Sequence, residues 1–147
     1  MKKVLALLVV MCIMITSFSL VSYADDSLKI KINGYNHEYD VMPVIINSRT
    51  MVPMRGIFES LGADISWDGD TKTVRAFGVN GTVITHIIGE ASAIVNGEFV
   101  TLDTPSQIIN GRTMVPVRFV SEALGEKVDW DADTKTVIIG DKLVAKS

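Results

Sequence analysis

One cysteine, Cys12, and two histidines, His37 and His86, occur among the 147 residues. These side chains bind copper and zinc and act as nucleophile or base in many hydrolases, so such chemistry has few residues available here. Basic residues are also in deficit, at 14 against 17 acidic ones. Nucleic acid and anionic lipid both require a basic surface, and the net charge of −3 therefore argues against either as a partner.

Residues 1–24 are typical of a secretory signal peptide. Two lysines follow Met1, an uncharged apolar run extends to about Leu20, and Ser22-Tyr23-Ala24 places small residues at positions −3 and −1 of a cleavage site. We predict cleavage after Ala24, which leaves residues 25–147 secreted or at the cell surface with no stable membrane anchor. An uncleaved anchor is one alternative, because the run is at the short limit for spanning a bilayer. A lipoprotein is another, since Cys12 lies inside the run.

Removal of the signal peptide would take away the cysteine and two lysines, leaving a net charge of −5. No disulfide could then form, so a hydrophobic core must hold the fold together. A chain of this size buries enough apolar surface to do so as one domain.

An internal repeat covers most of residues 25–147. A gapless shift of 63 residues aligns Ile46–Val74 with Ile109–Val137, and 18 of these 29 positions are identical. We therefore predict one domain made of two copies of a unit. The first unit spans about residues 28–78 and the second about residues 91–140.

Strand and turn signals follow the same order in both units. In the first, Leu28–Ile32 alternates apolar and polar residues, Asn33-Gly34 is a hairpin turn, and the returning strand is expected to reach about Val41. A short strand, a helix of about eight residues and a second hairpin follow. A further strand, Thr82–Ile88, lies between the units. The sequence predicts an α+β fold with mostly antiparallel strands, two short helices and a pseudo-symmetric duplication.

Residues that recur in both units are interpreted as requirements of the fold. Proline suits the first helical turn, and glycine suits a left-handed helix C-terminus. The repeated structural motif consists of Arg49, Pro53, Arg55, Gly62, Trp67 and Asp68 in the first unit, and Arg112, Pro116, Arg118, Gly125, Trp130 and Asp131 in the second.

Charged members of the motif are expected to form structural ion pairs. The repeated acids Asp68/Asp131 and Glu59/Glu122 are the candidate partners of the four repeated arginines. Ligand binding by those arginines is the alternative.

The long segment Asn110–Gly125, with Val128–Asp131 and Thr134–Val137 after it, resembles the copper amine oxidase N-terminal domain-like family, a stalk module. The first unit matches the same pattern, with Ser48 in place of the usual glycine. The resemblance implies a small α+β domain of exported Gram-positive proteins, often attached to wall-associated modules. It transfers no catalytic residue, because the copper and quinone of the full oxidases belong to a separate domain.

Metal and cofactor sites are not expected. His37 and His86 are not at equivalent positions of the two units, and Glu38-Tyr39-Asp40 departs from the Asn-Tyr-Asp/Glu setting of the quinone cofactor. Asp129–Asp133 has the alternating acids of a calcium loop. However, Thr134 and Gly140 stand where an EF-hand needs glycine and glutamate, so a hairpin turn is the preferred interpretation.

Aromatic residues remain as candidates for binding. Tyr35, Tyr39 and Phe99 lie on or near hairpins, while Trp67 and Trp130 end strands. A role for the tryptophans in the core is favoured, with stacking on wall sugars as the alternative.

The hypothesis favoured by the sequence is a non-catalytic interaction or scaffold module that binds cell-wall polymer or another surface protein. A small wall-associated enzyme is one alternative, although no histidine recurs with Ser121-Glu122 or Glu59-Ser60 to make a nucleophile and base. A metal-handling protein is another. Any function is expected where the units differ, such as Gly34–Tyr39 against Gly97–Leu102.

Overall fold

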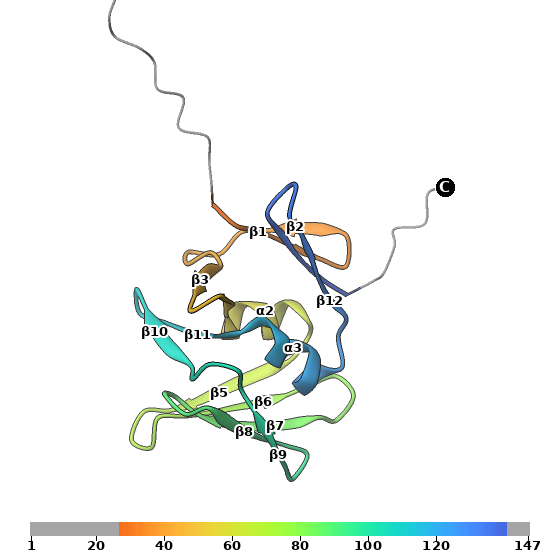
Figure 1. Ribbon diagram of the computed structural model, residues 1–147. Coiled ribbons are helices and arrows are strands. Elements are labelled where there is room, and N and C mark those ends of the chain that lie inside the picture. The colour runs from red at the N-terminus through yellow and green to blue at the C-terminus, as the bar shows by residue number, and fades with distance from the viewer. Residues whose placement is uncertain (1–26, 141–147) are drawn as a thin grey trace, which may run out of the picture.

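The structure is a computed structural model that describes residues 27–140 (Figure 1). The predicted signal peptide and its cleavage site lie outside the described residues. Within residues 27–140, no helix is long and apolar enough to cross a membrane.

Thirteen short strands and two helices make up the described chain. The strands are β1 (Lys29–Ile32), β2 (Tyr35–His37), β3 (Val44–Ile46), β4 (Arg49–Pro53), β5 (Asp64–Asp68), β6 (Thr73–Phe77), β7 (Val83–Ile87), β8 (Ser92–Val95), β9 (Glu98–Thr101), β10 (Gln107–Ile109), β11 (Arg112–Pro116), β12 (Val128–Asp131) and β13 (Thr136–Ile139), and the helices are α2 (Met54–Ser60) and α3 (Val117–Leu124).

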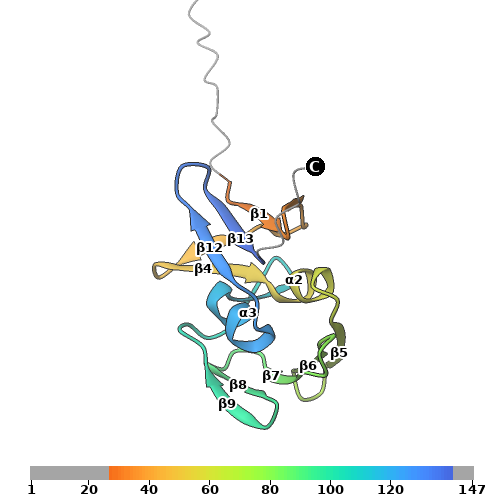
Figure 2. The same ribbon diagram turned by 90° about the vertical axis from the view of Figure 1, so that its right-hand side faces the viewer.

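The strands form three sheets. A central sheet has the order β10-β11-β4-β3, a four-stranded outer sheet has the order β12-β13-β1-β2, and a five-stranded outer sheet has the order β5-β6-β7-β8-β9. The pairing of β1 with β13 is parallel and the other recorded pairings are antiparallel. In both views the helices lie between the two outer sheets (Figures 1 and 2). The structure therefore confirms the predicted α+β class with mostly antiparallel strands.

Elements of the two units correspond at the 63-residue spacing. For example, β1 starts at Lys29 and β8 at Ser92, while β4 starts at Arg49 and β11 at Arg112. Strand β7 has no counterpart among residues 27–140, and it lies between β6 and β8 in the five-stranded sheet. In the four-stranded sheet, β1 pairs directly with β13. In the five-stranded sheet, the equivalent strands β8 and β6 are separated by β7.

Two features of the strands differ from the sequence prediction. Strand β2 ends at His37 rather than near Val41, and the three-residue strands β3 and β10 were not predicted as separate elements. The early end of β2 coincides with the end of its ladder to β1. Its pairing with β1 stops at Ile30 and His37, after which the two segments separate.

The helices have the predicted length and position. Each begins directly after a proline, and Pro53 and Pro116 are the N-cap residues as well as the last residues of β4 and β11. Gly62 and Gly125 have φ of 86° and 70°, the left-handed conformation that glycine adopts without steric cost. Helices of seven and eight residues are too short to be stable alone, so burial of one face must hold them.

One main core joins the helices to the sheets. Phe58 of α2 and Phe119 of α3 are fully buried, with ring centroids 6.1 Å apart. Val52 and Val115 pair across β4 and β11 and belong to the same core. A second, smaller cluster of Val41, Met51 and Met114 lies beside the central sheet.

Candidate functional site

The repeated arginines form ion pairs, in a pattern that differs in part from the expected one. Arg55 and Arg118 contact the acid four residues later on their own helices, with Nε–Oε1 distances of 2.9 Å to Glu59 and 3.2 Å to Glu122. These pairs are exposed, so they contribute little to stability.

Arg49 and Arg112 pair across the two units. Arg112 Nε donates to Asp40 Oδ2 at 2.8 Å, and the equivalent Arg49 lies 3.7 Å from Asp103. Asp103 is also 3.7 Å from Arg118. The Arg112 guanidinium is the main reason that the pKa of the Asp40 carboxyl lies below its usual value. Arg112 and Arg49 thus each pair with an acid of the other unit.

Asp68 and Asp131 are not partners of the arginines, which corrects that part of the expected pairing. Each carboxylate accepts backbone N–H groups of its own turn: Asp68 from Asp70 at 3.0 Å, and Asp131 from Asp133 at 3.0 Å. Hydrogen bonds from the turn lower the pKa of both acids. This arrangement is an Asx turn, which these residues form readily.

The two tryptophans are half exposed rather than buried, contrary to the favoured prediction. Trp67 is 50% exposed and lines a hollow with Ile108 of edge strand β10, whereas Trp130 is 46% exposed and lines one with Ile45 of edge strand β3. Ile45 and Ile108 are equivalent residues of the two units. The two hollows therefore share an equivalent tryptophan and isoleucine, whereas their other lining residues differ.

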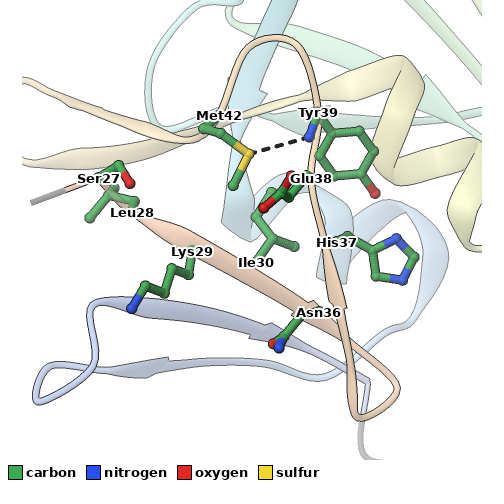
Figure 3. A pocket seen from close by; sticks show the side chains of 9 residues that line it. All are labelled: Ser27, Leu28, Lys29, Ile30, Asn36, His37, Glu38, Tyr39 and Met42. Carbon is green, nitrogen blue, oxygen red and sulfur yellow. Dashed lines mark hydrogen bonds between the residues drawn. The ribbon is translucent and has the colours of Figure 1, made fainter. Parts of the chain in front are cut away.

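A third hollow, of about 400 Å³, lies beside the first hairpin and has a different origin (Figure 3). It is lined by Ser27, Leu28, Lys29, Ile30, Asn36, His37, Glu38, Tyr39 and Met42. We call it the hairpin hollow. Four of its lining residues, Asn36–Tyr39, belong to the segment in which the sequence predicted a difference between the units.

The hairpin hollow is open because the first hairpin separates early. In the second unit the ladder continues to Ser92 and Thr101, and Leu102 N–H donates to Ala91 O at 2.8 Å. In the first unit the equivalent N–H, that of Tyr39, instead donates to the Met42 sulfur at 3.3 Å (Figure 3). The backbone N–H that closes the second hairpin therefore makes no equivalent bond across the first hairpin.

The ring of Tyr39 packs directly against Gly56 of α2. Its hydroxyl lies 2.7 Å from Ser60 Oγ, and a Cβ on Gly56 would lie only 2.6 Å from the tyrosine ring. Burial raises the pKa of the Tyr39 hydroxyl, and the hydrogen bond with Ser60 partly opposes this. The equivalent of Gly56 in the second unit is Phe119, so only the first unit has room for this ring.

Three polar side chains of the hairpin hollow are available to a ligand. His37 stacks on Tyr39 with ring centroids 6.1 Å apart and an interplanar angle of 16°. Within residues 27–140, the side chains of Lys29, Asn36 and Glu38 have no hydrogen-bond or ion-pair partner. The site offers an ammonium, an amide and a carboxylate beside a pair of stacked rings.

The other histidine has a structural setting that the sequence did not reveal. His86 on β7 is 1% exposed, and its Nδ1 donates to Ser92 O at 2.9 Å. Ser106 Oγ donates to His86 Nε2 at 2.6 Å and accepts the Gly89 N–H at 2.8 Å. Burial lowers the pKa of His86, so the neutral imidazole is favoured.

Metal-binding side chains do not cluster in the described part of the chain. Over residues 27–140, no three side chains of the ligating types His, Cys, Asp and Glu come together. His37 and His86 lie on different outer sheets.

Comparison with known proteins gives the family. Residues 31–139 match the family described as "Copper amine oxidase N-terminal domain", and the chain belongs to this family. Among curated proteins, it is 31% identical over 113 residues to a protein of Brevibacillus choshinensis named "Protease inhibitor". The aligned segment is 76% of this chain and 34% of the relative, so the chain spans about a third of that protein's length.

Proposed function

We propose that this protein is a non-catalytic binding module that takes a cell-wall glycan in the hairpin hollow. The observation that carries the proposal is that this hollow occurs in the first unit, where Lys29, Asn36 and Glu38, which have no partner within residues 27–140, line the same hollow as the rings of His37 and Tyr39. Its volume of about 400 Å³ falls within the range of small-ligand sites, roughly 300–1,000 Å³.

The chemistry of the lining matches that of an amino sugar chain. Sugar hydroxyl and acetamido groups need both donors and acceptors, which Lys29, Asn36 and Glu38 supply. The apolar face of a sugar ring can pack on an exposed aromatic face, and the His37 ring provides one beside Tyr39. Bacterial peptidoglycan, a polymer of N-acetylated amino sugars, is therefore the proposed ligand.

Several features support a role in binding rather than catalysis. His37 makes no hydrogen bond to a hydroxyl or carboxylate among the described residues, so it is not paired with a nucleophile. The family is named after an N-terminal domain rather than a catalytic one. We further propose that the chain is exported by cleavage after Ala24, and that its two units are pseudo-symmetric copies from a duplication. The twelve motif residues would then serve the shared fold.

The proposal is tested by co-sedimentation of the protein with purified peptidoglycan, followed by titration with soluble muropeptides. Asn36→Ala with Glu38→Ala should weaken binding at least tenfold while leaving the fold intact, because both side chains are exposed and unpaired. The matched control is Phe99→Ala with Thr101→Ala, at the equivalent positions of the second unit, and it should bind normally. Trp67→Ala and Trp130→Ala should also bind normally.

Two results would decide against this function. Absence of binding to peptidoglycan would refute the proposal. Loss of binding in the tryptophan variants alone would show that the glycan binds in the other two hollows. Turnover of muropeptides during the titration would support the enzyme alternative, whereas binding of copper, zinc or calcium would support the metal-handling one.

A second candidate is protein binding of the kind that an inhibitor performs. The relative named "Protease inhibitor" favours it, although the match covers about a third of that protein. Residual activity of serine, cysteine and metalloproteases in the presence of the protein tests it. Dose-dependent loss of activity would support this candidate, and unchanged activity across the panel would argue against it.

A further inference from the structure

The five-stranded sheet presents an apolar surface on the side that faces away from the helices. On β6 and β7, Val74, Ala76, Ile84 and His86 alternate inward and are buried. The residues between them point outward, as the period of two in a strand requires. The apolar face is formed by Phe77, Val83, Ile87, Ile94 and Phe99, which are each between 38% and 81% exposed.

Strand register places these side chains next to one another. Phe77 is directly opposite Val83, and Ile94 is directly opposite Phe99. Thr85 lies between the two pairs, opposite Arg75 on β6 and Ile94 on β8. Contiguous exposed apolar groups of this kind are uncommon on monomers and mark an interaction surface.

Two of these positions are polar in the equivalent hairpin of the other outer sheet. Lys31 corresponds to Ile94, and Asn36 corresponds to Phe99. Both hairpins therefore fold with either kind of residue facing outward. The apolar residues on β8 and β9 are consequently not needed to form the hairpin. Their exposure on this face is explained if another molecule binds there.

The charges on this face make it complementary to itself. Arg75 lies on β6 next to Ser66 of β5, and Asp64 lies two residues before Ser66 on the same strand. Arg75 interacts electrostatically with Asp68 on β5, but within the described chain neither Arg75 nor Asp64 makes a hydrogen bond or a close ion pair. A two-fold contact uses the same patch on both copies, so it can bring Arg75 of one copy to Asp64 of the other.

We propose that two copies of this chain associate face to face through the apolar face, with Arg75 and Asp64 pairing across the interface. Two sheets stacked in this way resemble the layers of a β-sandwich, whose facing side chains interdigitate. The association is independent of the hairpin hollow, because that hollow is lined by residues before Pro43 and this face begins at Asp64.

Sedimentation equilibrium of the intact protein, purified from the cells that produce it, tests the proposal. From about 1 μM to about 1 mM, the weight-average mass should rise from one copy to two. Ile94→Lys and Phe99→Asn should each raise the dissociation constant at least tenfold without unfolding the domain, since Lys31 and Asn36 occupy the equivalent positions. Ile45→Ser removes an apolar residue of intermediate exposure, 58% against 38% for Ile94 and 81% for Phe99, from the central sheet and should have no effect.

Charge exchange separates this contact from simple hydrophobic association. Arg75→Asp should weaken the dimer, and combining it with Asp64→Arg should restore it. A protein that stays monomeric to about 1 mM would overturn the proposal, as would a dimer that is unaffected by Ile94→Lys. A monomer that binds a different protein through this face would equally overturn it in favour of a heterologous partner.

Discussion

The two outer sheets are built from equivalent strands, yet they differ in what they leave open. In the four-stranded sheet, β1 of the first unit lies directly against β13 of the second. In the five-stranded sheet, β7 separates β6 from β8 and brings the buried His86 to the hairpin. The hairpin beside β7 is closed, whereas the hairpin without it opens into the hairpin hollow. Among the described residues, β7 thus distinguishes a filled end of the molecule from one with room for a ligand.

The same comparison applies to the helices. Gly56 on α2 leaves space for the Tyr39 ring, and the equivalent Phe119 on α3 fills its own space against Phe58 and His86. In the first unit, the space beside the helix is therefore filled by Tyr39, which follows the hairpin. In the second unit, the equivalent space is filled by Phe119 of the helix itself. The predictions below test this division, from the largest expected effect to the smallest.

Phe119→Ala should cause the largest loss of stability. The ring is 1% exposed and contacts both Phe58 and His86, so its removal leaves a cavity at the centre of the core. We expect the free energy of unfolding to fall by about 3–5 kcal/mol. Urea denaturation measures this, with Phe99→Ala as the control because Phe99 is 81% exposed. A loss below about 1 kcal/mol would contradict the packing described here.

The burial of His86 should make the stability of the protein sensitive to acid. Burial lowers the pKa of His86 in the folded state below its ordinary value of about 6.5, so the unfolded state binds more protons as the pH falls through that region. The contribution of His86 to the free energy of unfolding should be fully present above about pH 6.5, and it should decrease as the pH falls toward the pKa of His86 in the folded state. Denaturation at several pH values measures this decrease.

Variants of the same bond provide the controls. His86→Gln should remove the decrease in stability over that pH range, and His37→Asn should leave it unchanged because His37 is on the other outer sheet. Ser106→Ala should cost about 1–3 kcal/mol at pH 8, since Gly89 N–H and His86 Nε2 both lose a partner. A pH profile that is unchanged in His86→Gln would assign the acid sensitivity to other groups.

Reciprocal changes at Ser48 and Gly111 should have opposite effects of about 1 kcal/mol. The two residues occupy equivalent turns, with φ of 61° for Ser48 and 77° for Gly111. A side chain is disfavoured in this left-handed region, so Ser48→Gly should stabilise the protein and Gly111→Ser should destabilise it. Thermal denaturation of both variants provides the measurement. Changes of the same sign would show that the two turns are not under the same strain.

Gly56→Ala should change the stability least, while displacing the Tyr39 ring. The new Cβ would meet the ring at 2.6 Å, but alanine favours the helix by about 1 kcal/mol and offsets part of that cost. Once displaced, Tyr39 should lose its burial, and its raised pKa should return toward 10. Spectrophotometric titration of the tyrosines detects this, and Tyr39→Phe identifies the signal. An unshifted titration would mean that the helix moves instead of the ring.

Much of the fold follows from local sequence. Asn33-Gly34 and Asn96-Gly97 adopt positive φ at both positions, as the hairpin prediction requires, and Pro53 and Pro116 precede the helices. The early end of β2 did not follow, because it depends on the contact between Tyr39 and Gly56, which are far apart in the chain. The burial of His86 was missed for a similar reason, since Ser106 and Phe119 lie well beyond β7 in sequence.

The candidate site was only partly predictable. Comparing the two units identified the segment Gly34–Tyr39, because its residues after Gly34 differ from those after Gly97 in the second unit. The contribution of Ser27–Ile30 and Met42 to the hairpin hollow depends on the separation of two strands, which no residue pattern indicates. Half exposure of Trp67 and Trp130 was also not predictable, since it depends on where strands β5 and β12 end relative to the central sheet.

Chemical-shift mapping tests the central claim most directly, because it compares the two hairpins in one experiment. A soluble muropeptide is titrated into the isotope-labelled protein, and the backbone amide shifts of both units are followed. We predict dose-dependent shifts confined to Ser27–Ile30 and Asn36–Met42, with the equivalent amides of β8 and β9 unchanged. Shifts in both hairpins alike, or shifts centred on Trp67 and Trp130, would contradict the assignment of function to the hairpin that differs.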